Sequence, residues 1–157
     1  MVSHGVAWHE GYLYVSEQHR ITRYRGSGLQ ALLKALPEFI FDNMSDSSWH
    51  AQRDHVFSPM GNLYVTLGTP FLNPKRHQGA IMRMGPDGSN PVVFASGIRN
   101  SIGMDFHPIT GEIHFTDNGA DQMGNDIPPE ELNRAAKADL HFGYHFFGGG
   151  KALTRPF

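Results

Sequence analysis

The chain has 157 residues, of which 39% are hydrophobic and 18% charged, with a formal net charge of −2 at pH 7 and no cysteine. This composition is typical of a folded protein with a real core, and it excludes an intrinsically disordered chain and a disulfide framework. The near-neutral charge lacks the excess of basic residues that is typical of nucleic-acid-binding proteins. No apolar run is long enough to span a membrane.

A strand–turn–strand unit occurs three times along the chain. Each copy is an apolar strand ending in an aromatic residue, a turn containing glycine, and a second alternating strand. The aromatic residues Trp8, Phe57 and Phe106 follow one another at intervals of 49 residues. The three copies are GVAWHEGYLYVSE from Gly5, DHVFSPMGNLYVTLG from Asp54 and GMDFHPITGEIHFTDNG from Gly103.

Further elements are predicted between these copies. Third strands are expected in RITRYR from Arg20 and AIMRMGPDG from Ala80, and fourth strands in PEFIF from Pro37 and PVVFAS from Pro91. Two segments have helical character, GLQALLKAL from Gly28 and PPEELNRAAKA from Pro128. The second begins with two prolines followed by glutamates, which favours the start of a helix.

Four short antiparallel strands that repeat every forty to fifty residues are typical of a β-propeller blade. We therefore predict an all-β fold with three consecutive four-stranded blades, at about residues 5–53, 54–102 and 103–147, followed by a tail at 148–157. Propellers close into a ring with roughly four to eight blades. Residues 1–157 are thus expected to form a partial propeller domain, truncated at one or both ends.

The repeat also predicts where a functional site lies. His50 and Arg99 each stand seven residues before the aromatic residue of their copy. Both are therefore expected in the loop that leads into the innermost strand of a blade, where loops of successive blades meet around the central channel. We expect His50, Arg99 and Asn100 to face one shared cavity.

The acidic loop from Asp117 and the remaining histidines are less specific signs of a functional site. The segment DNGADQMGND from Asp117 lacks the glycine and glutamate positions of an EF-hand. Such an oxygen-rich loop can still bind calcium through carbonyl groups, or it can be a polar loop capped by its own Asx turns. His9 and His107 are expected at blade edges or turns. His141 and His145 have the i, i+4 spacing of a zinc pair, but the segment around them is not convincingly helical.

In these residues the chain resembles the soluble quinoprotein glucose/sorbosone dehydrogenases, six-bladed propellers that use pyrroloquinoline quinone (PQQ), and especially the sorbosone-type branch. The resemblance covers roughly residues 5–146. It is most specific in GIRNSIGMDFHPITGEIHFTDNGAD and PPEELNRAAKADLHFGY. It implies oxidation of a sugar hydroxyl or hydrated aldehyde to a lactone or acid, a periplasmic or extracellular location, and a cytochrome or quinone as electron acceptor.

The resemblance also implies residue roles. His50 would be the general base, Arg99 would stabilise charge beside the quinone carbonyls, and Asn100 would hydrogen bond the cofactor. The backbone carbonyls of Gly119 and Ala120 would bind a calcium ion that polarises the quinone.

This chain departs from the family pattern at several points. Trp49 stands where glucose-type members carry an acidic residue, and the cysteines frequent in sorbosone-type relatives are absent. The chain ends at Phe157, before the blades that would supply basic residues for the carboxylates of the cofactor. The isolated chain is therefore expected to be inactive. The start MVSHGVAW lacks the features of a signal peptide, so either the protein is cytosolic or its N-terminus is missing here.

Two other functions stay open at this point. One is a calcium-dependent propeller lactonase or related hydrolase, and the other is a non-catalytic propeller used as a binding module. A lactonase site needs several carboxylate or amide side chains around the channel axis, whereas the predicted channel residues are His50, Arg99 and Asn100. An arginine next to a catalytic cation is better explained by an anionic cofactor between them.

Overall fold

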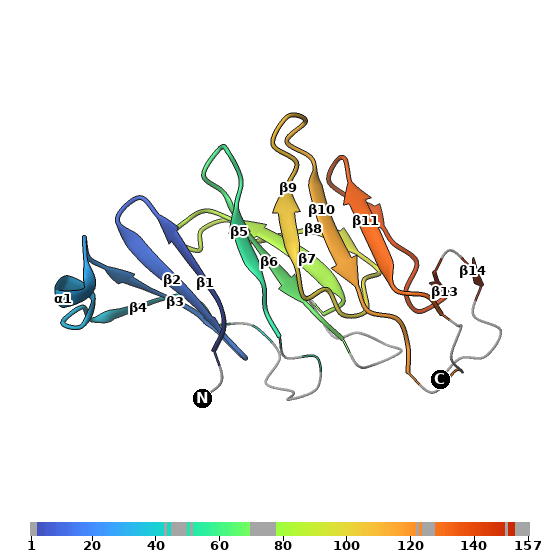
Figure 1. Ribbon diagram of the computed structural model, residues 1–157, viewed down its shortest axis with the longest axis horizontal. Coiled ribbons are helices and arrows are strands. Elements are labelled where there is room, and N and C mark those ends of the chain that lie inside the picture. The colour runs from blue at the N-terminus through green and yellow to red at the C-terminus, as the bar shows by residue number, and fades with distance from the viewer. Residues whose placement is uncertain are drawn as a thin grey trace.

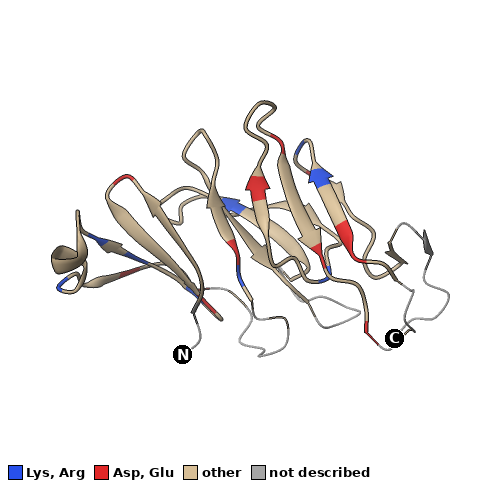
Figure 2. Ribbon diagram, in the orientation of Figure 1, with Lys and Arg blue, Asp and Glu red and all other residues tan. Residues whose placement is uncertain are grey.

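Antiparallel sheets placed side by side make up nearly all of the computed structural model (Figure 1). It describes residues 3–42, 44, 50, 52–69, 78–121, 123, 128–149 and 151–152. Within these residues no helix has the length and the apolar character that crossing a membrane requires. Figure 2 shows the Lys and Arg positions and the Asp and Glu positions distributed along the ribbon, on strands and loops of all three blades.

Blade 1 is a four-stranded antiparallel sheet in chain order. Its strands are β1 (Ser3–His9), β2 (Tyr12–Glu17), β3 (Ile21–Arg25) and β4 (Pro37–Phe41). The helix predicted from Gly28 is a single turn, α1 (Leu29–Leu32), between β3 and β4. It buries none of its residues and its N-terminus has no side-chain cap, so little beyond intrinsic propensity holds it.

Blades 2 and 3 follow. Blade 2 contains the antiparallel strands β5 (His55–Phe57), β6 (Leu63–Leu67), β7 (Ala80–Met84) and β8 (Val92–Ser96). Blade 3 contains β9 (Met104–Phe106), β10 (Ile113–Asp117) and β11 (Glu131–Ala135). Three short strands come last, β12 (Leu140–His141), β13 (Phe147–Gly148) and β14 (Lys151–Ala152).

Blade 3 differs from the prediction of four strands, because in the described part of the chain it has three. After β11 the chain returns to blade 2, where β12 pairs in parallel with β8. The amide of Asp139 donates to the carbonyl of Phe94 at 2.9 Å, and the amide of Phe142 donates to the carbonyl of Ser96 at 2.8 Å. The outer strand of a sheet leaves backbone groups unpaired, and β12 satisfies them on β8.

The helix predicted from Pro128 is wrong, because Glu131–Ala135 forms strand β11. This segment pairs with β10 from Asp117↔Glu131 to Ile113↔Ala135. Its burial alternates as in a strand, with Ala135 buried and Leu132 77% exposed. Pairing with a neighbouring strand has overridden the local preference for a helix.

The predicted repeat register is confirmed by the strand pairing. Trp8 pairs with Leu13, Phe57 with Leu63 and Phe106 with Ile113, so the aromatic residue has the same place in each blade. His9 and His107 lie at the ends of these inner strands as expected. His9 stacks on Phe57 with 4.0 Å between ring centroids, and Nδ1 of His107 accepts from two amides of its turn.

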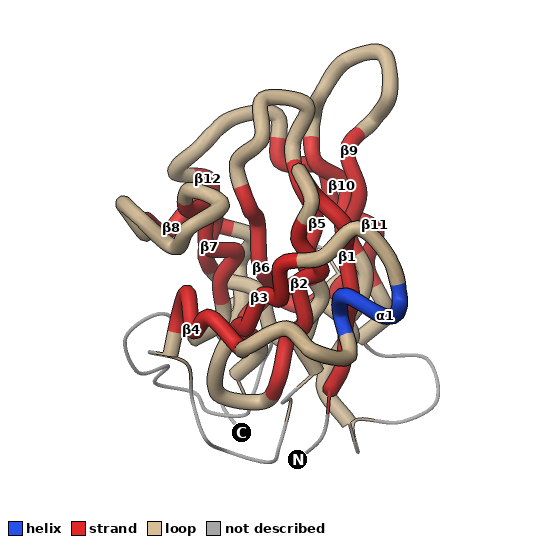
Figure 3. The backbone as a smooth tube through the Cα atoms, turned by 90° about the vertical axis from the view of Figure 1, so that its left-hand side faces the viewer, coloured by secondary structure: helices blue, strands red, loops and turns tan. Residues whose placement is uncertain are grey.

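The core lies between the faces of neighbouring blades, as in a β-propeller. Between blades 1 and 2, Tyr14 meets Phe57 edge to face at 4.7 Å. Between blades 2 and 3, Tyr64 meets Phe106 in the same way at 5.1 Å. The inner strands β1, β5 and β9 are neighbours in this arrangement, which Figure 3 shows along the row of blades.

A buried histidine lies between blades 1 and 2. His55 is 5% exposed, and its Nδ1 is 3.1 Å from Oγ of Ser16. Its Nε2 has no hydrogen-bond partner within the described residues. Burial lowers the pKa of His55 to about 4, so the imidazole is neutral in the folded state at pH 7.

We expect His55 to make the fold sensitive to acid. Its pKa is lower in the folded state, so the unfolded chain binds more protons and stability falls as the pH drops from 6.5 towards 4. Between pH 7 and pH 4.5 the free energy of unfolding should fall by about 2–3 kcal/mol through this group. Urea unfolding of wild type and His55→Gln at both pH values measures the difference.

The comparison with His55→Gln separates this effect from that of Asp117. Burial raises the pKa of Asp117 to about 6, so its contribution to stability is present at low pH and lost as the pH rises, the opposite sign. NMR titration of the His55 imidazole gives its pKa directly if the variant folds poorly. A value near 6.5, or equal pH dependence in both proteins, contradicts the prediction.

Candidate functional site

His50 lies in the turn before β5 and is half-buried. Its Nδ1 is 2.9 Å from the carbonyl oxygen of Thr69, just after β6. Because a carbonyl only accepts, Nδ1 carries the hydrogen, and Nε2 of the neutral ring keeps its lone pair. Burial, helped by the positive charge of Arg99, lowers the pKa of His50. The imidazole is therefore neutral at pH 7 and can accept a proton.

The backbone around His50 is strained and firmly held. His50 has a φ of +54°, a conformation that non-glycine residues rarely adopt and that is frequent at functional sites. Arg53, only 2% exposed, donates from Nη1 to the carbonyls of His50 at 2.6 Å and Gln52 at 3.0 Å. Burial lowers the pKa of Arg53 to about 10, which still leaves the guanidinium charged at pH 7.

Gly68 lets His50 and Asn100 approach each other. A β-carbon at position 68 would lie 2.9 Å from Oδ1 of Asn100 and 3.0 Å from Cβ of His50, closer than side chains tolerate. The amide of Thr69 donates to the carbonyl of Arg99 at 2.8 Å. Residues 68 and 69 thus join the loop of His50 to the loop of Arg99 and Asn100.

Asp117, the last residue of β10, fixes the backbone of the Arg99–Asn100 pair. Its two carboxylate oxygens accept from the amide of Arg99 at 2.9 Å and from the amide of Asn100 at 2.6 Å. Burial raises the pKa of this carboxyl group, and these two hydrogen bonds oppose the shift. The sequence pattern predicts Asp117 in a self-capped or calcium-binding loop and gives no sign of this role.

The side chain of Arg99 binds the loop after β10. Nη1 donates to the carbonyls of Gly119 at 2.5 Å and Asn118 at 3.2 Å, and Nη2 lies 3.1 Å from Oδ2 of Asp121. Burial raises the pKa of Tyr144, and the nearby charge of Arg99 opposes this shift. Arg99 is 13% exposed, so its charge is presented from a largely enclosed position.

A small, partly open pocket lies beside Arg99. The loop after β10 and the segment after β12 close it: the amide of Gly119 donates to Glu130 at 2.9 Å, and the amide of Gly149 donates to Glu131 at 2.5 Å. Arg99 lines the pocket, whereas His50 and Asn100 are not among its lining residues and lie against Gly68. The lining includes Arg99, Asp117, Gly119, Glu131, Tyr144 and Phe147.

These groups suit an anionic cofactor that carries carbonyl groups. Arg99 offers a fixed guanidinium, and the buried Oδ1 of Asn100 has no partner within the described residues. A buried acceptor without a partner is costly, and only an N–H or O–H donor of a bound group can satisfy it, not a carbonyl or carboxylate oxygen. The carbonyl of Gly119 accepts from Arg99, so it becomes available to a cation when the guanidinium has another partner. In the described part of the chain no three His, Asp or Glu side chains come together, so backbone oxygens would have to provide most ligands.

The row of antiparallel blades packed face to face defines a partial β-propeller, and the polar loops described above lie at one end of its inner strands. The chain matches the Glucose / Sorbosone dehydrogenase family over residues 10–151, and it belongs to this family.

Solved structures of sugar dehydrogenases share the fold. The holo PQQ domain of pyranose dehydrogenase from Coprinopsis cinerea has a TM-score of 0.72 and 16% identity, covering 90% of this chain and 42% of that one. The PQQ-bound aldose sugar dehydrogenase from Streptomyces coelicolor has a TM-score of 0.67 and 22% identity, covering 90% and 46%. The calcium structure of a family AA12 enzyme from Trichoderma reesei has a TM-score of 0.70 and 19% identity, covering 90% and 43%.

A relative closer in sequence is an uncharacterized protein of Borreliella burgdorferi. It is 40% identical over 108 residues, which is 67% of this chain and 28% of that protein. This chain therefore spans less than half the length of each of these four proteins.

Proposed function

We propose that this chain forms part of a PQQ-dependent sugar dehydrogenase that oxidises a sugar hydroxyl or hydrated aldehyde to a lactone or acid. One observation carries the proposal: Gly68 and Thr69 join a neutral, strained His50 to the Arg99–Asn100 pair. The residue to which we assign proton transfer is thereby joined to the pair to which we assign the cofactor. Membership of the Glucose / Sorbosone dehydrogenase family supports the same conclusion.

The residues of the chain would act as follows. Nε2 of His50 accepts the hydroxyl proton of the sugar, while Nδ1 stays bonded to Thr69 and fixes the ring. Arg99 and Asn100 hold the cofactor, and Asp117 fixes their backbone. The carbonyls of Gly119 and Ala120 hold a calcium ion. When bound, PQQ with its calcium supplies the acceptor for the hydride from the sugar carbon.

The finer features of the proposal follow from the same resemblance. The substrate is an aldose or a sorbosone-type sugar, the enzyme works in the periplasm or outside the cell, and its electrons pass to a cytochrome or a quinone. A lactonase is less well supported, since the carboxylate of Asp117 is engaged by two backbone amides and does not serve as a channel ligand.

We expect calcium to bind more tightly when PQQ is present, because Arg99 occupies the carbonyl of Gly119 without it. A bound quinone gives the guanidinium a new partner and leaves the carbonyl oxygens to the cation. Calorimetric titration of calcium into a complete propeller that contains this chain, with and without PQQ, measures this coupling. Equal calcium affinity in both titrations contradicts the proposed cation site, and tight calcium binding together with no PQQ binding favours a lactonase.

A further inference from the structure

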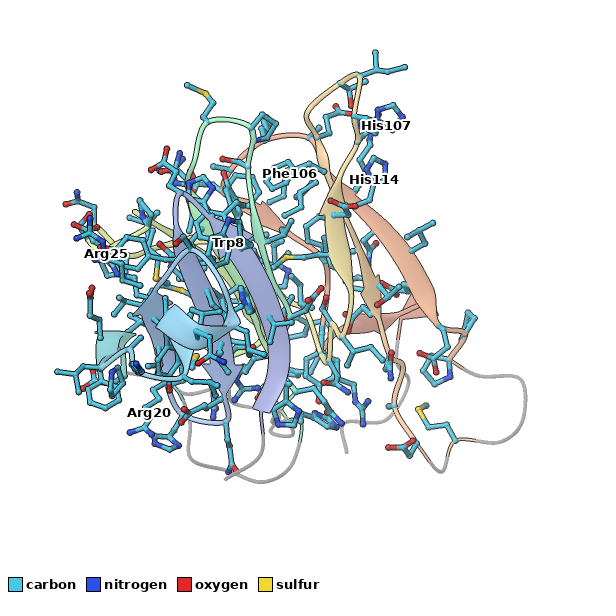
Figure 4. The ribbon with its side chains drawn as sticks, turned by 60° about the vertical axis from the view of Figure 1, so that its left-hand side comes forward. Trp8, Arg20, Arg25, Phe106, His107 and His114 are labelled. Atoms are coloured by element: carbon cyan, nitrogen blue, oxygen red, sulfur yellow. The ribbon has the colours of Figure 1, made fainter. Side chains whose placement is uncertain are left out.

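Arg53 is the largest side chain that the described part of the chain buries completely. Burying a charge is costly, so an enclosed arginine usually pairs with a carboxylate. In Figure 4, by contrast, Arg20 and Arg25 of blade 1 reach to the outside of the molecule. Among the described residues no carboxylate forms an ion pair with Arg53. The arginines that do have such partners are Arg20 with Glu17, Arg23 with Glu38, Arg99 with Asp121 and Arg134 with Glu112.

The hydrogen bonds of the Arg53 guanidinium go to the loop of His50. Nη1 donates to the carbonyls of His50 and Gln52, and Nε has no partner within the described residues. An arginine that joins two blades bonds across their interface, as Arg23 of β3 does when it donates to the carbonyl of Pro86 in blade 2 at 3.0 Å. The guanidinium of Arg53 instead holds the loop that precedes it.

The main chain of Arg53 is anchored to blade 1. Its carbonyl accepts from Oγ of Ser16, a fully buried residue of β2, at 2.8 Å. A β-carbon at Gly5 of β1 would lie only 3.1 Å from the same carbonyl, so blade 1 packs closely against it. Arg53 thus connects the interface of blades 1 and 2 to the turn that carries His50.

His50 needs support of this kind. Its φ of +54° is unfavourable for a residue with a β-carbon, and such a conformation persists only where its surroundings fix it. The bond from Arg53 holds the carbonyl of His50, and the bond between Nδ1 and the carbonyl of Thr69 holds the ring. With the main chain and the ring both held, the direction of Nε2 is fixed as well.

The charges around His50 also favour its neutral form. Burial is the largest cause of its lowered pKa, and the guanidinium groups of Arg99 and Arg53 lower the pKa further. The bond to Thr69 and the carboxylate of Asp121 oppose these effects. Arg99 forms an ion pair with Asp121 and is assigned to the cofactor, whereas no ion pair within the described residues offsets the charge of Arg53. Arg53 therefore disfavours the imidazolium whether or not a cofactor is bound.

We propose that Arg53 is a positioning residue for the reaction: it fixes the main chain of His50 and keeps the imidazole in the form that accepts the proton of the sugar hydroxyl. The inference rests on the proposed function, because it takes His50 as the base. Arg53 acts through His50 and is assigned no contact with sugar or cofactor. Replacing a buried charged group by an apolar side chain of similar volume often costs no stability, so packing alone does not explain this guanidinium.

NMR titration of His50, in a complete propeller that contains this chain and without PQQ, tests the effect of the charge. Arg53→Gln removes the charge and keeps N–H donors for the loop carbonyls, so the pKa of His50 should rise. Arg23→Gln is the matched control, because Arg23 is also largely buried and also donates to a main-chain carbonyl, and it should leave the pKa of His50 unchanged. An unchanged pKa of His50 in Arg53→Gln overturns the proposal.

Steady-state kinetics of the same propeller with PQQ, calcium and an aldose test the positioning. Arg53→Met removes the charge and the donors, so kcat should fall by up to about 10²-fold, while KM and PQQ affinity change little. The acid limb of kcat/KM should move to higher pH, because the imidazole is protonated more readily. Arg53→Gln should move the acid limb in the same way and recover part of kcat.

The outcomes separate a positioning role from mere support of the fold. Circular dichroism checks that each variant is folded, and Arg53→Gln decides the question if Arg53→Met is not. A loss of activity that is equal at every pH, with the acid limb unmoved, shows that Arg53 only supports the fold and overturns the proposal. A wild-type propeller that oxidises no sugar refutes the proposed function, and the NMR titration still decides whether Arg53 controls the protonation of His50.

Discussion

Replacing His50 with alanine is expected to lower sugar turnover by about 10²–10⁴-fold, the usual range for loss of a general base. The reason is geometric: Nδ1 is bonded to Thr69, so Nε2 is the nitrogen that can take a proton. PQQ affinity should change little, because the imidazole is assigned to the sugar and the cofactor is held by Arg99 and Asn100. Steady-state oxidation of aldoses with an artificial electron acceptor tests the effect, in a complete propeller that contains this chain.

The matched control is His19→Ala, which removes an exposed histidine of blade 1 and should leave turnover unchanged. The pH profile adds a second test. Burial sets the pKa of His50 below its usual 6.5, so kcat/KM should stay high at pH 6.5 and fall only at lower pH, as the imidazole becomes protonated. Wild-type turnover in His50→Ala would show that His50 is not the base.

The blades could be predicted from the sequence because their pattern is local. Alternation with a period of two and the 49-residue interval between Trp8, Phe57 and Phe106 both appear directly in the residues. The segment from Pro128 could not be assigned in this way, because its local preference is helical and its pairing with β10 is a tertiary contact. The parallel strand β12 depends equally on the open edge of β8, which only the folded chain brings near.

Some residues of the candidate site could be predicted from the sequence, and others only from the folded chain. His50, Arg99 and Asn100 could be proposed because the repeat register places them in corresponding loops. Asp117 was missed as their support because its partners lie 17 and 18 residues away in sequence. Gly68 shows no signal in one sequence, since a glycine after a strand is usual in turns. Only the approach of His50 and Asn100 around it explains the missing side chain.

Arg99→Ala is expected to impair both turnover and PQQ binding, which distinguishes Arg99 from His50. The guanidinium is assigned to the quinone carbonyls, and losing a hydrogen bond from a charged group costs about 1.5–3 kcal/mol. This corresponds to a rise in the Kd for PQQ of about 10- to 150-fold. Arg99→Lys should recover only part of the affinity, since a lysine keeps the charge but not the planar fork that can bond the quinone and Asp121 together.

Two controls separate a contact with the cofactor from support of the loop. Asp121→Asn removes the ion pair of Arg99 with a side chain that is 81% exposed, so it should change PQQ affinity far less than Arg99→Ala. Arg25→Ala removes an exposed arginine of blade 1 and should change neither quantity. The decisive measurements are PQQ titration and steady-state turnover for each variant. If Arg99→Ala lowers turnover but binds PQQ like wild type, Arg99 holds the loop of Gly119 in place and does not contact the cofactor.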